Sequence, residues 1–174
     1  MRKPISSGLF LFLIIILNAC TKPVQLINIT KNENGIFRGI DIGDSPEKVM
    51  SLEDSLTLKD KARANTYLYY DIPVKVRGGT KGANSFTIAY NFEDEHLYEI
   101  QVDVYLESED DCQRIYKDFI TLYNKKYGKY IKDQDYLVWN TKSAEGDNIS
   151  IELINESNEY KDGKLSLTIF NTDY

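Results

Sequence analysis

The most regular pattern of hydrophobic and polar positions lies in the middle of the chain. Apolar and polar residues alternate over residues 86–92 and again over residues 98–106. The polar run Glu93-Asp94-Glu95-His96 separates the two stretches. Alternation with a period of two is typical of a β-strand that buries one face. The two stretches therefore predict an antiparallel hairpin.

A stripe with a different period follows this hairpin. Between Cys112 and Tyr127, apolar residues recur at steps of three and four positions. This spacing predicts an amphipathic helix. Ser108 stands where an N-cap belongs, and Gly128 stands where a helix commonly ends.

Shorter or less regular versions of these two patterns predict the remaining elements. Ser45-Pro46-Glu47 combines a cap, a first-turn proline and an acid, which predicts the start of a second helix. Residues 54–64 leave a continued helix and a loop as alternatives. Further strands are predicted over residues 66–76, 136–140, 149–154 and 165–170.

The predicted order is helix, three strands, helix, three strands. Strands joined by short turns are antiparallel, and one-sided alternation leaves one sheet face for the helices to cover. We therefore expect an α+β fold in two layers, built from tandem α-β-β-β units, as a single domain over residues 36–174. Residues 20–35 show no apolar period and are predicted to be a tether, with a short edge strand over residues 24–29 as the alternative.

The N-terminus has the three parts of a secretory signal. Arg2 and Lys3 precede an unbroken apolar run from Leu9 to Leu17, and a small residue, Ala19, follows it. Nine apolar residues are too few to cross a hydrocarbon core of about 30 Å. Residues 1–19 are therefore predicted to be removed.

Leu17-Asn18-Ala19-Cys20 resembles the lipobox of bacterial lipoproteins, although Asn18 is bulkier than the usual small residue. The resemblance implies that Cys20 carries acyl chains, which anchor a protein stably when two or more are present. Ordinary signal cleavage beside an incidental cysteine is the alternative. Thr21 stands where enteric bacteria place Asp to retain lipoproteins in the inner membrane, so the resemblance implies the outer membrane.

Charge and cysteine content narrow the possible partners. The chain has 27 acidic and 21 basic residues and a formal net charge of −6, without a basic cluster. Such a surface repels phosphate backbones, so no nucleic acid partner is expected.

Cys20 and Cys112 are the only cysteines. With Cys20 acylated, Cys112 has no intramolecular partner, and its acidic neighbours favour a buried structural cysteine over a reactive thiol.

The segment Gly39-Ile40-Asp41-Ile42-Gly43-Asp44-Ser45-Pro46-Glu47-Lys48-Val49 resembles the opening of a known structural unit. Similar openings occur in β-lactamase-inhibitor-protein-like lipoproteins and in small assembly lipoproteins of the SmpA/OmlA kind. Tyr127-Gly128, Trp139 and the alternating residues 149–153 and 165–169 are similar to the ending of such units. The resemblance implies a fold whose known members bind other proteins.

No residue constellation predicts catalysis. His96 is the only histidine, and it is expected to be a solvated turn residue. Gly78-Gly79-Thr80-Lys81-Gly82 lacks phosphate-loop spacing and precedes a strand instead of a helix. The acids of residues 107–111 complement a helix N-terminus and need no metal. Neither a metal nor a cofactor is predicted, and nothing selects a carboxylate pair for a hydrolase.

Thirteen tyrosines are the most unusual feature of the composition. Strand phase places Tyr105 and Phe170 on the face opposite the core, and Trp139 is either a third member of this group or a core residue. We predict that the three form a contact patch, because aromatic side chains offer large contact area at low entropic cost. The sequence thus favours a non-enzymatic cell-envelope lipoprotein that binds another envelope protein as an assembly accessory. Capture of a small molecule or glycan is the alternative.

Overall fold

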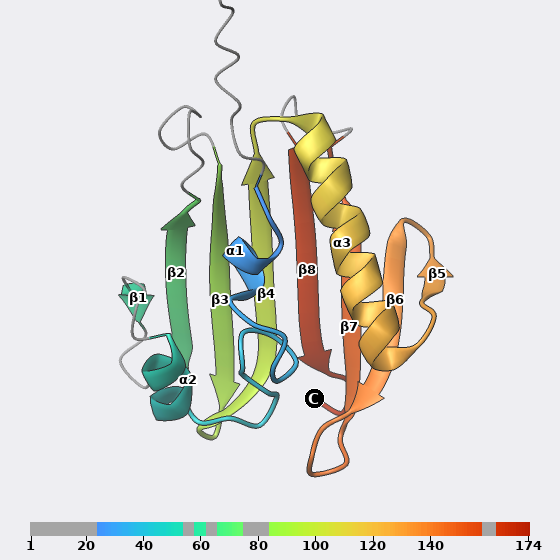
Figure 1. Cartoon of the computed structure of the whole chain (residues 1–174). Coiled ribbons are helices and arrows are strands. Elements are labelled where there is room, and N and C mark those ends of the chain that lie inside the picture. The colour runs from blue at the N-terminus through green and yellow to red at the C-terminus, as the bar shows by residue number, and fades with distance from the viewer. Residues whose placement is uncertain (1–23, 54–57, 62–65, 75–83, 158–162) are drawn as a thin grey trace, which may run out of the picture.

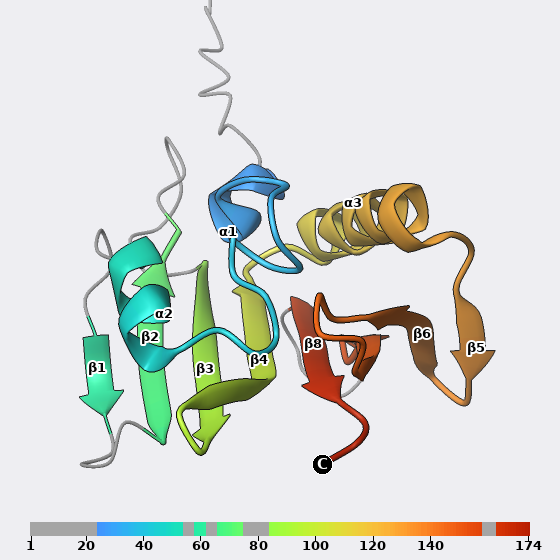
Figure 2. The same ribbon diagram turned by 90° about the horizontal axis from the view of Figure 1, so that it is seen from below.

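The computed structural model describes residues 24–53, 58–61, 66–74, 84–157 and 163–174. Its framework is one antiparallel sheet with the strand order β1-β2-β3-β4-β8-β7-β6-β5 (Figure 1). The strands are β1 (Leu58–Lys61), β2 (Tyr67–Pro73), β3 (Ser85–Glu93), β4 (His96–Leu106), β5 (Ile131–Asp133), β6 (Tyr136–Lys142), β7 (Asn148–Asn155) and β8 (Gly163–Asn171). The helices are α1 (Ile27–Thr30), α2 (Pro46–Leu52) and α3 (Glu109–Tyr127). All three helices lie on one side of the sheet (Figure 2).

The predicted α+β class is confirmed, as are both predicted helices and the six predicted strands. The structure adds two short edge strands, β1 and β5, that the sequence pattern did not indicate. Residues 58–61 form β1, so the expectation of a helix or a loop for this part of residues 54–64 is wrong. Cys20 and the glycine-rich residues 78–82 lie outside the described residues.

The predicted helix caps are confirmed by their hydrogen bonds. The Ser45 hydroxyl accepts a bond from the Lys48 backbone N–H at 3.3 Å, and the Ser108 hydroxyl accepts one from the Asp111 N–H at 3.4 Å. Each bond satisfies an N–H group that has no partner within the helix. Gly128 ends α3 with a φ of +85°, a conformation that favours glycine.

The core lies between the helices and one face of the sheet. At the centre of the sheet, β4 and β8 pair Ile100 with Ile169 and Val102 with Leu167, and all four side chains are buried. The helix α3 packs its apolar stripe against them. Close contact here depends on Gly163, because a Cβ at this position would lie 2.4 Å from the Cβ of Cys112 on α3.

The N-terminal segment belongs to this core. Val24 and Ile29 are fully buried, and α1 occupies residues that were expected to form a tether or an edge strand. The Arg114 guanidinium on α3 donates a hydrogen bond to the Val24 carbonyl. Residues 24–35, which were predicted to be part of a tether or an edge strand, therefore pack into the folded domain, so the described part of the domain extends N-terminal to Ile36.

A buried ion pair joins this segment to α2 and to the sheet. Arg38 Nε lies 2.5 Å from Glu53 Oε1, and Arg38 Nη2 lies 2.8 Å from Glu53 Oε2. The Tyr90 hydroxyl on β3 donates to Glu53 Oε1 at 2.6 Å. Both charged side chains are almost completely buried. Burial is tolerated because each charge has an opposite charge and further hydrogen bonds.

Replacing Glu53 with Gln leaves the Arg38 guanidinium buried without a counterion. We expect the Glu53→Gln substitution to lower the free energy of unfolding by about 3–5 kcal/mol, the range for breaking a buried ion pair from one side. Urea denaturation measures the change. Glu33→Gln is the matched control, because Glu33 and Lys125 pair with 60% and 71% of their side chains exposed. The control should change stability by less than about 1 kcal/mol. Equal losses in the two variants would contradict the prediction.

Candidate interaction surface on the open sheet face

The sheet face opposite the helices, here called the open face, is polar at its centre. Its residues alternate along each strand with the core residues described above. The open-face positions of the central strands include Thr87, Gln101, Asp103, Ser166 and Thr168. Polar side chains can form hydrogen bonds to water or to one another, so this part of the sheet does not need to be buried under another layer.

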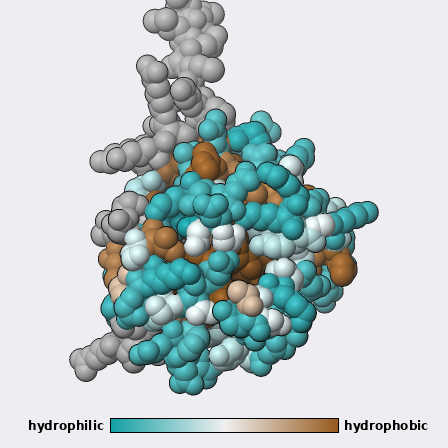
Figure 3. Space-filling view, turned by 60° about the horizontal axis from the view of Figure 1, so that its bottom comes forward, coloured by the Kyte–Doolittle hydropathy of each residue, from teal (hydrophilic) through white to brown (hydrophobic). Residues whose placement is uncertain are grey.

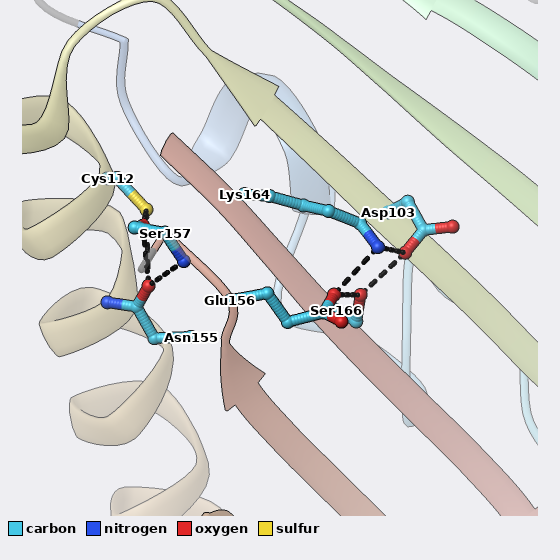
Figure 4. Close-up of polar contacts among 7 residues, drawn as sticks. All are labelled: Asp103, Cys112, Asn155, Glu156, Ser157, Lys164 and Ser166. Carbon is cyan, nitrogen blue, oxygen red and sulfur yellow. Dashed lines mark hydrogen bonds and ion pairs between the residues drawn. The ribbon is translucent and has the colours of Figure 1, made fainter. Parts of the chain in front are cut away.

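Four charged or polar residues join neighbouring strands on the open face (Figure 4). Lys164 Nζ lies 2.7 Å from Glu156 Oε2 and 3.7 Å from Asp103 Oδ1. The Ser166 hydroxyl oxygen lies 2.6 Å from Asp103 Oδ1 and 2.5 Å from Glu156 Oε2. One ammonium group thus balances two carboxylates across β4, β8 and the end of β7. This arrangement engages the ammonium group in ion pairs, so we interpret it as a structural link.

The Glu156 carboxyl should make stability depend on pH. Partial burial opposes its ionisation, but hydrogen bonds from Lys164 and Ser166 outweigh burial and hold its pKa below the ordinary value of 4.5. Glu156 therefore adds stability above that ordinary value and loses this contribution as pH falls through its lowered folded-state pKa. We expect Glu156→Gln to reduce the free energy of unfolding near neutral pH and to have a smaller effect in strong acid.

Urea denaturation at both pH values tests this expectation. Glu95→Gln, in the exposed turn between β3 and β4, is the control and should have little effect at either pH. A stability loss from Glu156→Gln that is the same at both pH values would show that its charge does not matter.

Cys112 on α3 points its sulfur toward Asn155 and Ser157, on either side of Glu156 in the sequence (Figure 4). Its side chain is fully buried, which confirms the prediction of a buried cysteine. Burial raises the pKa of the thiol, and the nearby Glu109 adds to this rise, while the contact of Sγ with the Ser157 hydroxyl at 3.0 Å lowers it. A buried thiol with a raised pKa is a poor nucleophile. Cys112 is therefore a packing residue.

The three aromatic residues of the predicted contact patch do not come together. Tyr105 is 38% exposed on the open face, and Phe170 lies half-buried on the same face. Tyr105 pairs with Lys164, whereas Phe170 pairs with Glu99. Glu99 and Tyr105 are six residue steps apart on β4, a distance of about 20 Å along the strand. The two aromatic residues thus cannot share one compact patch.

The inclusion of Trp139 in this patch is wrong. Trp139 pairs with Ile151, a core position of β7, and only 1% of its surface is exposed. Its indole N–H donates to Asn124 Oδ1 at 3.0 Å, and its ring centroid lies 5.5 Å from that of Tyr123. Trp139 therefore anchors β6 to α3. Polar and apolar residues do not alternate regularly in the sequence of β6, so the pattern does not show which face of the sheet Trp139 is on.

Removing the buried aromatic side chain of Trp139 and removing the exposed one of Tyr105 should have different effects on stability. Trp139→Ala should lower the free energy of unfolding by about 3–5 kcal/mol, as is usual when a large buried aromatic side chain is removed. Tyr105→Ala is the control and should change it by less than about 1 kcal/mol, because the side chain is exposed on the sheet surface. Thermal or urea unfolding measures both. A large loss in the Tyr105 variant would place that side chain in the core.

Exposed apolar side chains gather instead at the β5 end of the open face. Ile131 on β5 is 62% exposed and pairs directly with Val138 on β6. Tyr136, which is 40% exposed, lies on the same side of β6 as Val138, and Ile154 on β7 is a neighbour in the adjacent strand. We call these four residues, Ile131, Tyr136, Val138 and Ile154, the edge patch.

The edge patch was not found from the sequence because β5 was not predicted. The turn of the β5–β6 hairpin is Gln134-Asp135, and Gln134 has a φ of +53°. Glycine or asparagine would have marked this turn, since they adopt positive φ easily. The sequence feature that could have indicated this hairpin is the pair of apolar residues, Ile131 and Tyr136, on either side of the turn.

Two pockets in the described part of the molecule have linings that include no residue of the edge patch. One has a volume of about 310 Å³ and lies between α1 and α3, with Leu26, Ile27 and Leu122 in its lining. The other has about 170 Å³ and is lined by polar residues, including His96, Glu145 and Asp147, together with Tyr174. Figure 3 shows the helix-covered face and the end of the molecule near this second pocket. Hydrophobic residues form only small separate areas there.

Among the described residues, no group of three or more histidine, cysteine or acidic side chains is arranged to hold a metal ion. Within the same ranges, no helix is long and apolar enough to cross a membrane. Comparisons with protein-family models, with curated proteins and with solved structures found no match. The fold thus defines an α+β protein with one eight-stranded antiparallel sheet and an exposed apolar edge.

Proposed function

We propose that the protein is a non-enzymatic lipoprotein of the bacterial cell envelope that binds another envelope protein through the edge patch. Acyl chains on Cys20 would hold it in the outer membrane, and the folded domain would serve as an assembly accessory. The observation that carries this proposal is the exposure of Ile131 and Tyr136 together at one edge of the sheet.

The chemistry of the edge patch supports protein binding. An edge strand presents unpaired backbone N–H and C=O groups, and proteins commonly protect such strands from other chains. Here β5 forms the end of the sheet and carries an isoleucine that is 62% exposed. A partner that covers Ile131, Tyr136 and Val138 would bury apolar area, and an extended partner segment would also pair with the strand edge.

We further propose that the domain consists of two α-β-β-β units, each extended by one short edge strand. The order of elements supports this reading, because α2 precedes β1 to β4 and α3 precedes β5 to β8. The sheet order is symmetric as well, since the last strands of both halves, β4 and β8, pair at its centre. This arrangement agrees with the resemblance to lipoprotein units that bind other proteins.

Capture of a small molecule or glycan is the second candidate. The pocket beside Tyr174 supports it, because carboxylates and an aromatic ring are groups that bind sugars, and Tyr174 stacks on Tyr98 with ring centroids 5.7 Å apart. Its volume of about 170 Å³ is small, however, compared with the roughly 300–1,000 Å³ of typical ligand sites. The pocket between α1 and α3, at about 310 Å³, reaches only the lower end of that range, so protein binding is the preferred function.

Photo-crosslinking in intact cells tests the preferred function. A photoreactive amino acid at position 131 or 136 should crosslink to a distinct envelope protein. At position 140, which is exposed on the same face of β6 but lies outside the edge patch, it should crosslink weakly. Equal yields from positions 131 and 140, or no product from position 131, would contradict the proposal.

The Ile131→Asp substitution tests the energetic role of the patch. We expect it to reduce binding of the crosslinked partner by at least about tenfold, the equivalent of 1.4 kcal/mol, because a charge would be buried in an apolar contact. The free energy of unfolding should remain nearly unchanged, because the side chain is exposed. Asn140→Asp is the control, since it adds a charge to the same face.

A further inference from the structure

We propose that the end of the domain next to Val24 lies against the surface of the bilayer to which Cys20 is attached. This inference rests on the proposed acylation of Cys20. It adds an orientation, because the domain would present one particular end to the lipid headgroups and would not extend from the membrane on a long tether.

Val24 is a fixed point at one end of the sheet. Its side chain is fully buried, and its carbonyl accepts a hydrogen bond from Arg114 in the second turn of α3. The helix α3 begins directly after β4 ends at Leu106. Val24 therefore lies near the end of the sheet where β4 finishes and α3 starts (Figure 1). We call this end the Val24 end.

The connection from Cys20 to Val24 is short. It contains four residue steps, and even a fully extended chain spans no more than about 3.3–3.6 Å per residue. The Cα of Cys20 therefore lies within about 14 Å of the Cα of Val24, and the sulfur that would carry the acyl chains lies within about 17 Å. Acyl chains on that sulfur occupy the hydrocarbon region of the membrane, so the Val24 end cannot move far from the headgroups.

The opposite end of the domain lies much further from the anchor. The strand β4 has eleven residues, from His96 to Leu106, and spans about 35 Å at 3.4 Å per residue. The turn between β6 and β7, which contains Ala144, and the C-terminus lie at the His96 end (Figure 1). A label at Ala144 is therefore far from the membrane when the strands point away from it.

Electrostatic attraction does not explain this placement. The first turn of α3, at the Val24 end, carries Glu109, Asp110 and Asp111. These acids would be repelled by anionic headgroups, so the short connection must hold the end in place. The proximity should consequently persist in zwitterionic vesicles and at high salt, where attraction between charges is screened.

The orientation narrows the choice of partner. Ile154 of the edge patch precedes Asn155, and the Asn155 side chain accepts a hydrogen bond from the Cys112 thiol in the first turn of α3. Ile154 therefore lies on the Val24 side of the sheet, whereas Ile131 and Val138 are level with Gln101 in the middle of β4. A protein embedded in the same membrane, or bound at its surface, would reach this patch more readily than one further away.

Energy transfer to the membrane tests the orientation. The full-length protein, produced with its own leader, is reconstituted in phosphatidylcholine vesicles that contain acceptor-labelled lipid headgroups. A fluorophore is attached through Gln113→Cys at the Val24 end or through Ala144→Cys at the far end, both at exposed positions. The buried Cys112 should not react, and the unsubstituted protein measures this background. We expect several-fold more efficient transfer from position 113 than from position 144.

A longer connection supplies the matched control. Twenty Gly and Ser residues inserted after Thr21 form a flexible coil with a mean span of about 25 Å. Transfer from position 113 should then fall toward the value at position 144. Intact-mass analysis of the same samples measures acylation. Acylated protein with equal transfer from both positions would overturn the orientation alone, whereas an unmodified Cys20 thiol would overturn the lipoprotein proposal as well.

Discussion

The buried ion pair between Arg38 and Glu53 determines how the N-terminal third of the domain packs. Glu53 lies at the C-terminal end of α2, where the helix dipole disfavours a negative charge, and its side chain is out of reach of water. Only a buried cation makes that position acceptable. Arg38 supplies it through two hydrogen bonds, donates a third to the Ile29 carbonyl, and lies over the Phe86 ring. The loop, α2 and β3 are thus held in one arrangement, with Arg38 in a left-handed conformation that alone would be unfavourable.

This arrangement bears on the proposed membrane anchor at Cys20. Because Arg38 binds the carbonyl of Ile29, and Arg114 binds that of Val24, the chain is fixed from its first described residue. A segment whose sequence suggests a flexible tether becomes part of the core, and only four residue steps remain between Val24 and Cys20. With the acylation of Cys20 that we propose, the contacts that stabilise the fold would also limit how far the domain extends from the bilayer.

Sequence periodicity predicted those parts of the fold that bury one regular face. The alternation in β3 and β4 and the stripe on α3 were sufficient, because each runs over many residues. The strands β1 and β5 have only four and three residues, too few for a period to appear. The burial of Val24, Ile29 and Arg38 depends on contacts with α2 and α3, which are distant in sequence. Trp139 was misplaced in part for the same reason, since its contacts with Asn124 and Tyr123 come from another element.

Charged and polar residues on most of the open face limit contact with other sheets, but one apolar site at its edge remains exposed. At its centre, Lys164 with Asp103 and Glu156 gives the sheet a charged and hydrated surface that discourages stacking with other sheets. At its edge, β5 is short and carries Lys132 and Asp133, features that limit unwanted strand pairing. Ile131 and Tyr136 nevertheless remain exposed between these charges. Polar residues at both positions would preserve the hairpin and remove the exposed apolar area. Their presence supports the proposal that a partner covers them, and the nearby charges would restrict which chains could do so.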